Sequence, residues 1–130
     1  MLFTTKTEYG LKALAILAQS GRKKTVSLAD IAKRTGLSLS YLEQIFAKLK
    51  AAKIITSIKG AEGGYALSRP AKEINLLEII SALEGRTAVN SCMAAGKLSC
   101  SGRCLTRKIW AEVQNNLEKT LKKYTLNNLI

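Results

Sequence analysis

SLADIAKRTGLSLSYLEQIFAKL, residues 27–49, carries the strongest structural signal in this 130-residue chain. Ser27 with Asp30 three residues later is typical of a helix N-terminus, because the hydroxyl can accept a hydrogen bond from the backbone of the third helical residue. The pattern predicts a short helix that runs through about Arg34, and Gly36 ends it. A second helix follows the glycine.

This second helix begins at Ser38 or Ser40, with Glu43 three residues after Ser40 as a capping partner. One of its faces is an apolar stripe that we expect to pack inward, formed by Leu39, Leu42, Ile45, Phe46 and Leu49. A short helix, a glycine turn and a longer helix form the helix-turn-helix arrangement, in which the second helix enters the major groove of DNA.

The opposite face of the second helix is polar and consists of Ser40, Tyr41, Glu43, Gln44 and Lys48. Glutamine can bridge N6 and N7 of adenine, a carboxylate can accept from N4 of cytosine, and hydroxyls and ammonium groups suit phosphates. We therefore expect this face to contact DNA, together with Ser38 at the start of the helix. The alternative is a solvated polar face, which any amphipathic helix has.

A β-hairpin is predicted directly after this helix. Two strand candidates, IITSI and YAL, flank the glycine-rich turn KGAEGG within residues 54–67. A hairpin in this place is a wing, and its basic tip at Lys59 and Gly60, with Arg69 nearby, would lie along phosphates or enter the minor groove. The glycines do not form a nucleotide-binding loop, because the strand-loop-helix order and the Lys-Ser/Thr ending are missing.

The composition supports a nucleic-acid partner. Hydrophobic residues make up 47% of the chain, enough for one compact domain, or for one domain with an appended dimerisation element. The net charge of +12 is uneven: residues 1–70 hold 12 lysines and arginines against 4 acids, and residues 71–130 hold 9 against 5. A positive field concentrated on one half favours a polyanion, DNA or RNA.

Two classes of protein are disfavoured. No apolar run approaches the roughly 18–20 residues that span a bilayer. Residues 11–18 (LKALAILA) start too late and are too short for a signal peptide, and they carry Lys12, so we expect an amphipathic first helix and a cytoplasmic protein. An enzyme is not expected either, because the chain has no histidine, no paired acids in a plausible cleft and no nucleophile beside a base.

The C-terminal half predicts two further helices. Asn75, with Glu78 at the third position, caps a short helix over residues 76–84 whose buried face is Leu76, Ile79, Ile80 and Leu83. A long helix over residues 105–124 carries an apolar stripe of Trp110, Val113, Leu117 and Leu121. The stripe exceeds what so small a core needs, so we expect the helix to pair with its copy in a homodimer. The alternative is a helix folded back on its own domain.

The predicted fold class is thus mainly α with a small β-hairpin, a winged helix-turn-helix plus a long C-terminal dimerisation helix. Residues 1–70 form the DNA-binding region. Residues 71–130 form one integrated domain, with a linker helix, a cysteine loop at 85–104 and the dimerisation helix at 105–124. Dimerisation would set two recognition helices about one DNA turn apart, on a near-palindromic operator.

The cysteines of the chain form one cluster. Cys92, Cys100 and Cys104 fall within thirteen residues, in a stretch that also holds Gly96 and Gly102. In the cytosol thiols are kept reduced, so such a cluster indicates metal or redox chemistry more often than a structural disulfide. A soft-metal pocket joined to a DNA-binding region predicts a sensor.

Several segments resemble the bacterial IscR/NsrR/RirA family of winged-helix regulators, and most closely its IscR branch, the regulators of iron–sulfur cluster assembly. The resemblance rests on SLADI, LSLSYLEQIF, GGY, CLT and the Trp110 helix, and it spans nearly the full length. It implies a cytoplasmic homodimeric transcription regulator of duplex DNA that acts as a repressor or activator. It also implies an iron–sulfur cluster, 2Fe-2S or 4Fe-4S, on Cys92, Cys100 and Cys104.

Two departures from the IscR pattern concern the cluster. The middle cysteine is spaced unevenly, and Arg107 stands where IscR has a histidine ligand. In the NsrR branch an acid near the N-terminus of the partner subunit reaches the cluster, and the matching residue is Glu8. Glu8 is therefore the candidate fourth ligand, from the partner subunit. The alternatives are a helix-dipole role for Glu8, or a solvent molecule or small thiol as fourth ligand.

The sequence leaves other cysteine chemistries open. These are a zinc ion on the three cysteines and a carboxylate, a Cys100–Cys104 disulfide switch, and apolar packing of free thiols. The predicted function is an iron–sulfur-sensing transcriptional regulator that responds to redox state, iron or nitric oxide. The alternative is a cluster-free thiol-switch or zinc-dependent regulator with the same fold.

Overall fold

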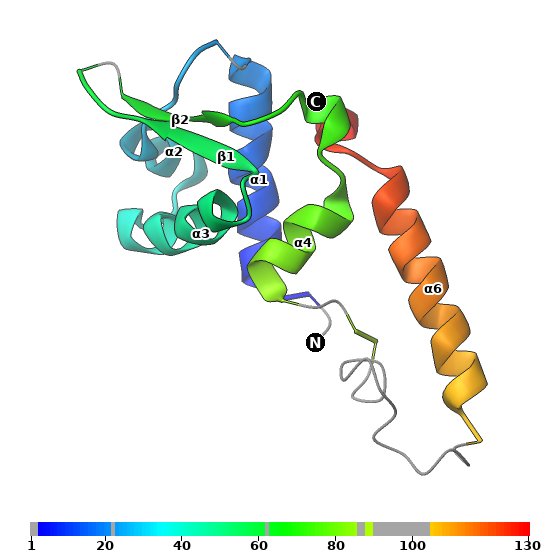
Figure 1. Cartoon of the computed structure of the whole chain (residues 1–130). Helices are drawn as coiled ribbons and strands as arrows, with labels where there is room; N and C mark the ends of the chain where they lie inside the picture. Colours follow the sequence, from blue (N-terminus) through cyan, green and yellow to red (C-terminus); the bar gives the residue numbers. More distant parts are fainter. Residues whose placement is uncertain (1–2, 22, 62, 86–87, 90–104) are drawn as a thin grey trace.

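The computed structural model describes residues 3–21, 23–61, 63–85, 88–89 and 105–130 (Figure 1). In chain order the elements are α1 (Thr5–Ser20), α2 (Leu28–Thr35), α3 (Leu39–Ala51), β1 (Ile55–Ile58), β2 (Gly64–Leu67), the 3-10 turn η1 (Ala71–Glu73), α4 (Leu76–Glu84), α6 (Arg107–Lys123) and the 3-10 turn η2 (Leu126–Leu129). Helix α1 packs against α2, α3, α4, β2 and η2. The predicted class, mainly α with a small hairpin and a winged helix-turn-helix, is confirmed.

Local signals position α2 and α3. The Ser27 hydroxyl accepts from the Asp30 N–H at 3.1 Å, and Gly36 ends α2 in the left-handed region with φ of 74°. Ser38, not Ser40, begins α3: its hydroxyl accepts from the Tyr41 N–H at 3.2 Å. Because Ser38 is already extended and its carbonyl accepts the first helical hydrogen bond, Ser40 lies inside the first turn and is not used as a cap.

The buried stripe of α3 is shorter than the sequence suggests. Leu42, Ile45, Phe46 and Leu49 are buried, but Leu39 is 47% exposed. Leu39 is the first residue of α3 and precedes the turns that cross the core, so the helical period alone does not bury it.

The wing is a two-stranded antiparallel sheet in which Ile55 pairs with Leu67 and Ile58 with Gly64. Tyr65 also exchanges two backbone hydrogen bonds with Val26, of 2.9 and 2.8 Å, so the segment before α2 lies along the outer edge of β2. A side chain at Gly64 would meet the Val26 carbonyl oxygen at 2.6 Å, which requires glycine there.

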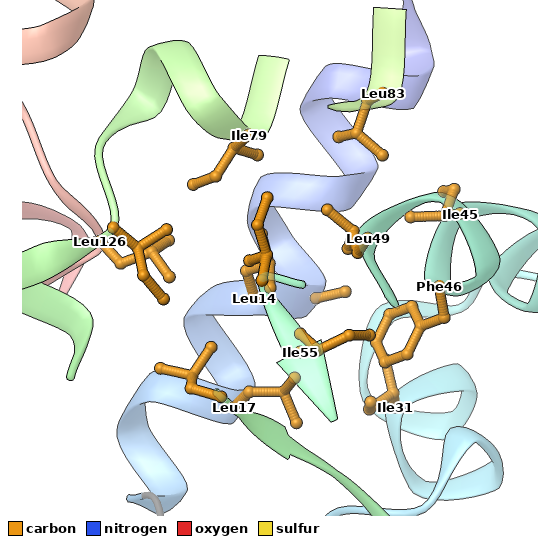
Figure 2. Close-up of a cluster of buried hydrophobic side chains, with 14 of the residues drawn as sticks. Leu14, Leu17, Ile31, Ile45, Phe46, Leu49, Ile55, Ile79, Leu83 and Leu126 are labelled. Carbon is orange, nitrogen blue, oxygen red and sulfur yellow. The ribbon is translucent and has the colours of Figure 1, made fainter. Parts of the chain in front are cut away.

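One hydrophobic core joins the two halves of the chain. Figure 2 shows Leu14 and Leu17 of α1 at the centre, surrounded by apolar side chains of α2, α3, β1, α4 and η2. Phe46 stacks edge-to-face on Tyr65, with ring centroids 4.9 Å apart, and so ties α3 to the base of the wing. None of the helices in the described ranges combines the length and hydropathy that a membrane crossing requires.

The chain end returns to this core, which the sequence did not predict. After α6, the Leu76 N–H donates to the Tyr124 carbonyl at 2.9 Å and the Leu126 N–H donates to the Ile74 carbonyl at 3.0 Å. Leu126 is fully buried. The segment after α6 therefore fixes the start of α4, whose Asn75 cap accepts from the Glu78 N–H at 2.9 Å as expected.

Candidate nucleic-acid interface

The face of α3 that points away from the core is small and polar. Its exposed residues include Ser40, Gln44, Ala47 and Ala51, which lie opposite the buried stripe on the helical period. Three of these four side chains are small, so the backbone of α3 can approach a surface closely. Gln44 is the one long hydrogen-bonding side chain among them, and Glu43 is exposed beside them.

Tyr41 lies on the flank of α3 that faces α1 and is not on the outward face. Its ring packs edge-to-face against Tyr9, with centroids 5.9 Å apart, and its hydroxyl lies 3.3 Å from the Thr5 hydroxyl. The side chain therefore fixes the position of α3 relative to α1. Tyr41 is half-buried, so only part of its side chain is accessible to a partner.

Lys48 occupies the same flank of α3, near the end of α4. Its ammonium is 3.4 Å from the Leu83 carbonyl, to which it donates. The pKa of Lys48 is lowered, first by the adjacent ammonium group of Lys6 and its charge and then by slight desolvation, with Glu84 acting in the opposite direction. Lys48 is thus placed beside the outward face and not at its centre.

The wing tip presents Lys59 and Gly60, both exposed. The turn is tight: the Gly63 N–H donates to the Gly60 carbonyl at 2.9 Å, and a side chain at Gly63 would meet the Ile58 carbonyl oxygen at 2.5 Å. Lys59 forms no ion pair with any acid in the described part of the chain. Its charge is therefore available to a phosphate.

Arg69, which the sequence placed near the wing tip, has another position. Its guanidinium donates to the Glu73 carbonyl at 3.1 Å and forms an ion pair with Glu78 at 3.0 Å. The residue follows β2 by two positions, so the chain has already turned away from the tip and Arg69 instead secures the start of α4.

Sequence reasoning missed a basic groove between the wing and the segment before α2. Lys23, Lys24 and Lys59 line it, with the Asp30–Arg34 ion pair (3.1 Å) at one side. The basic run before Val26 was visible in the sequence. Its proximity to the wing was not, because that depends on the pairing of Val26 with Tyr65.

Most of the expected metal-binding residues lie outside the description. Cys92, Cys100 and Cys104 fall in residues 90–104, of which the structure describes nothing. Glu8 is described: its side chain is 60% exposed on α1, and its carboxylate accepts from Lys12 at 3.2 Å. Arg107 is exposed as the first residue of α6. In the described ranges, no three Cys, Asp or Glu side chains are grouped to hold a metal ion.

The expected dimerisation stripe on α6 is exposed only in part. Trp110 is 36% exposed and Val113 40%, and Ile109, which sequence reasoning did not include, is 61% exposed. Leu117 is half-buried, and Leu121 is buried within its own chain. The exposed apolar patch of α6 is therefore its N-terminal half, defined here as Ile109, Trp110 and Val113.

A helix-turn-helix with a small polar outward face and a basic wing is the architecture of a DNA-binding protein. A family model described as Rrf2, iron-dependent transcriptional regulator, matches residues 3–130. The chain belongs to the Rrf2 family. The family expected from the sequence motifs is thereby confirmed.

Known members of the Rrf2 family extend this result. The HTH-type transcriptional regulator IscR of Vibrio vulnificus (strain YJ016) is 35% identical over 130 residues, which cover all of this chain and 77% of that protein. The solved structure of T. potens IscR matches with a TM-score of 0.77 and 37% identity, over 98% of this chain and 84% of that one. CymR (YrzC), the global cysteine regulator of B. subtilis, matches with a TM-score of 0.81 and 30% identity, over 98% and 94%.

These similarities make the chain an IscR-like transcriptional regulator of the Rrf2 family. Its relatives are named for the regulation of transcription, as the sequence led us to expect. Their names also indicate diversity within the family, since IscR and the cysteine regulator CymR share this architecture.

Proposed function

We propose that this Rrf2-family regulator is a homodimeric iron–sulfur sensor that binds near-palindromic operators in duplex DNA, in the cytoplasm. The observation that carries the proposal is the combination of three clustered cysteines with a family described as iron-dependent. The donor set fits such a cluster, because thiolates are its usual protein ligands and an exposed carboxylate is present on Glu8.

The DNA-binding part of the proposal assigns α3 to the major groove. Ser40, Glu43 and Gln44 would contact base edges, and the small Ala47 allows close approach. Ser38, Tyr41 and Lys48 on its start and flank would contact phosphates, while Lys59 and Gly60 at the wing tip would lie along phosphates or in the adjacent minor groove. The contacts at the phosphates supply affinity and those at the bases supply sequence discrimination.

The homodimer would form through α6. The patch of Ile109, Trp110 and Val113 needs cover in water, and pairing with the same patch of a second copy is the economical solution for a two-fold dimer. Each half-site would then lie about 34–36 Å from the other, one DNA turn apart.

The cysteines would act as the sensor. Cys92, Cys100 and Cys104 would hold the cluster, with Glu8 of the second subunit as the candidate fourth ligand. When bound, an iron–sulfur cluster supplies a centre that oxidants, nitric oxide or loss of iron can disrupt. The stretch that carries the cysteines connects α4 to α6. Binding of a cluster there would therefore act on α4, which packs on α1 and α3, and on α6, which would form the dimer.

The test is a UV–visible spectrum with iron, sulfide and zinc analysis of anaerobically purified protein. We expect iron and sulfide in parallel, bleached by air or nitric oxide, and loss of the chromophore when any one of the three cysteines is replaced by Ala. An intact spectrum in all three Cys→Ala variants would contradict the site. Glu8→Ala tests the fourth ligand, with Lys12→Ala as a control that removes the ion-pair partner of Glu8 and keeps the carboxylate.

A cluster-free regulator is the second candidate, because a structural neighbour is named for the regulation of cysteine and not for iron or iron–sulfur clusters. In that case the same protein is colourless and free of iron even after attempted cluster reconstitution. Zinc in the elemental analysis would then identify a zinc site on the three cysteines. A Cys100–Cys104 disulfide that changes operator affinity would identify a thiol switch.

A further inference from the structure

Two lysines from different helices come together beside α3. Lys6 lies in the first turn of α1 and Lys48 on the flank of α3, and both line two neighbouring depressions at the end of α4. One depression includes Glu84 and Gly85. The other includes Tyr41, Gln44, Ile45 and Leu83; Figure 2 places the Ile45 and Leu83 side chains on the same side of the core.

The nearest acid, Glu84, acts to raise the pKa of Lys48 but forms no ion pair with either lysine. The Glu84 carboxylate accepts from the Thr4 hydroxyl, from the Thr4 N–H at 3.2 Å and from the Thr7 hydroxyl at 3.0 Å. The Glu84 carboxylate therefore stabilises the start of α1.

Neither Lys6 nor Lys48 forms an ion pair within the described ranges, where the ion pairs are Lys12–Glu8, Arg34–Asp30 and Arg69–Glu78. The one hydrogen bond that Lys48 donates there, to the Leu83 carbonyl, is long at 3.4 Å. Two exposed ammonium groups that line the same depressions, with neither in an ion pair and with the Glu84 carboxylate offsetting their charge only in part, form a site for an anion. The lowered pKa of Lys48 agrees with this reading, because its first cause is contact with Lys6.

The place of the pair on α3 identifies the anion. An α-helix with its side chains is about 10–12 Å wide, and the major groove of B-DNA is about 12 Å wide. A helix in that groove therefore has phosphates along its flanks. Gln44, on the outward face of α3, lines the same depression as the two lysines. With α3 in the groove, the pair would therefore lie where the base edges meet the backbone.

We propose that Lys6 and Lys48 together hold one backbone phosphate of duplex DNA at the edge of the major groove that α3 occupies. The inference rests on the proposed DNA binding and adds Lys6, from a helix outside the helix-turn-helix. Because the two ammonium groups come from α1 and α3, the contact fixes the angle at which α3 enters the groove. It is independent of sequence, since it involves no base.

The first experiment measures binding to a fluorescent 30-base-pair duplex of random sequence by anisotropy, as a function of salt. We expect Lys6→Gln plus Lys48→Gln to weaken binding about tenfold per chain at 0.1 M salt, and to lower the slope of log K against log salt by about 0.9 per chain. The two single variants should be non-additive, because both lysines hold the same phosphate.

Lys72→Gln is the matched control, since it removes the same charge from an exposed lysine of η1, at the opposite end of α4. Its slope should stay within error of wild type. If the double variant loses no more affinity and salt slope than Lys72→Gln, the phosphate contact of Lys6 and Lys48 is wrong, while the proposed DNA binding stands. If the wild-type protein binds no duplex DNA, both the phosphate contact and the proposed function are wrong. Circular dichroism checks that the variants fold.

A second experiment locates the phosphate. An operator selected from a random library is prepared with neutral methylphosphonates at single positions. We expect the substitution at one position in each half-site to weaken binding of the wild-type protein. It should not weaken binding of the double variant, which lacks the two lysines that contact the phosphate at that position. If every methylphosphonate weakens both proteins equally, no single phosphate belongs to the pair and the proposal is wrong.

Discussion

Gln44 is the residue on which sequence discrimination should depend most. It is the longest hydrogen-bonding side chain among the residues opposite the buried stripe of α3, and a glutamine can contact adenine through two hydrogen bonds. We expect Gln44→Ala to cost about 1–3 kcal/mol on a selected operator and little on random duplex. The measurement is the ratio of the two affinities at one salt concentration.

Lys59→Ala is the counterpart of Gln44→Ala, because it removes a charge at the wing tip that we assign to the DNA backbone and not to base recognition. Both affinities should fall alike, and the salt slope should decrease by about 0.9 per chain. Equal losses on operator and random DNA for Gln44→Ala would argue against base contacts by Gln44.

Glu84 should make stability depend on pH. Burial would raise the pKa of its carboxyl, but the hydrogen bonds from Thr4 and Thr7 outweigh burial and hold that pKa below its usual range. Since the folded pKa lies below the unfolded value of about 4.3, the contribution is fully present above that value and is lost as pH falls through the folded pKa.

We expect Glu84→Gln to lower stability by about 1 kcal/mol at pH 7, because a neutral amide is a weaker acceptor in this partly exposed site. In acid the difference from wild type should shrink. Urea unfolding at several pH values measures it, and Glu73→Gln, on exposed η1, serves as the control. A difference that is constant down to acid pH would rule out the carboxylate as its cause.

At the scale of single residues, local chemistry was predictable and long-range contacts were not. Ser27, Gly36 and Asn75 act within their own turn, so the sequence indicated their roles correctly. Arg69 was misplaced, because its partner Glu78 is chosen by the path of the chain after the wing. Lys6 was missed for the same reason: nothing in the sequence brings it to Lys48.

Among the elements, η2 has the least obvious role in the sequence. Its six-residue neighbourhood, 125–130, shows no helical or strand period, yet Leu126 is fully buried in the same cluster as Ile74 and Ile79. The turn closes on itself through Thr125 and Asn128, which cap each other. The pattern of α3 and the alternation of the wing strands predicted their structures, whereas η2 is held by partners far away in the chain.

We therefore expect Leu126→Ala to lower the free energy of unfolding by about 2–5 kcal/mol, because it leaves a cavity in the core. Leu129→Ala removes the same atoms from a side chain that is 43% exposed, and should change stability by about 0.5 kcal/mol or less. Thermal and urea unfolding of the two variants give the comparison. Equal effects would mean that η2 does not pack on the core in solution.

For the whole molecule, the structure divides into a buried and an exposed part the stripe of α6 that the sequence predicted as one surface. Leu121 belongs to the fold of its own chain, while Ile109, Trp110 and Val113 form an apolar patch on the exposed surface. Periodicity predicts which residues share a face of a helix, but not which turns of that face are covered by the same chain. The residues available to a second copy are therefore those of the first two turns.

Val113→Asp tests that assignment, because a carboxylate in an apolar interface would lose its hydration without a partner. We expect the variant to elute as a monomer in size-exclusion chromatography with light scattering, with the fold of wild type by circular dichroism. Its affinity for an operator with two half-sites should fall toward that for a single half-site, because the two DNA-binding regions are no longer linked. Asn116→Asp, at an exposed polar position of the same helix, adds the same charge and should remain dimeric. A dimeric Val113→Asp protein would place the interface elsewhere, and the spacing of the two α3 helices would then have to be set by another surface.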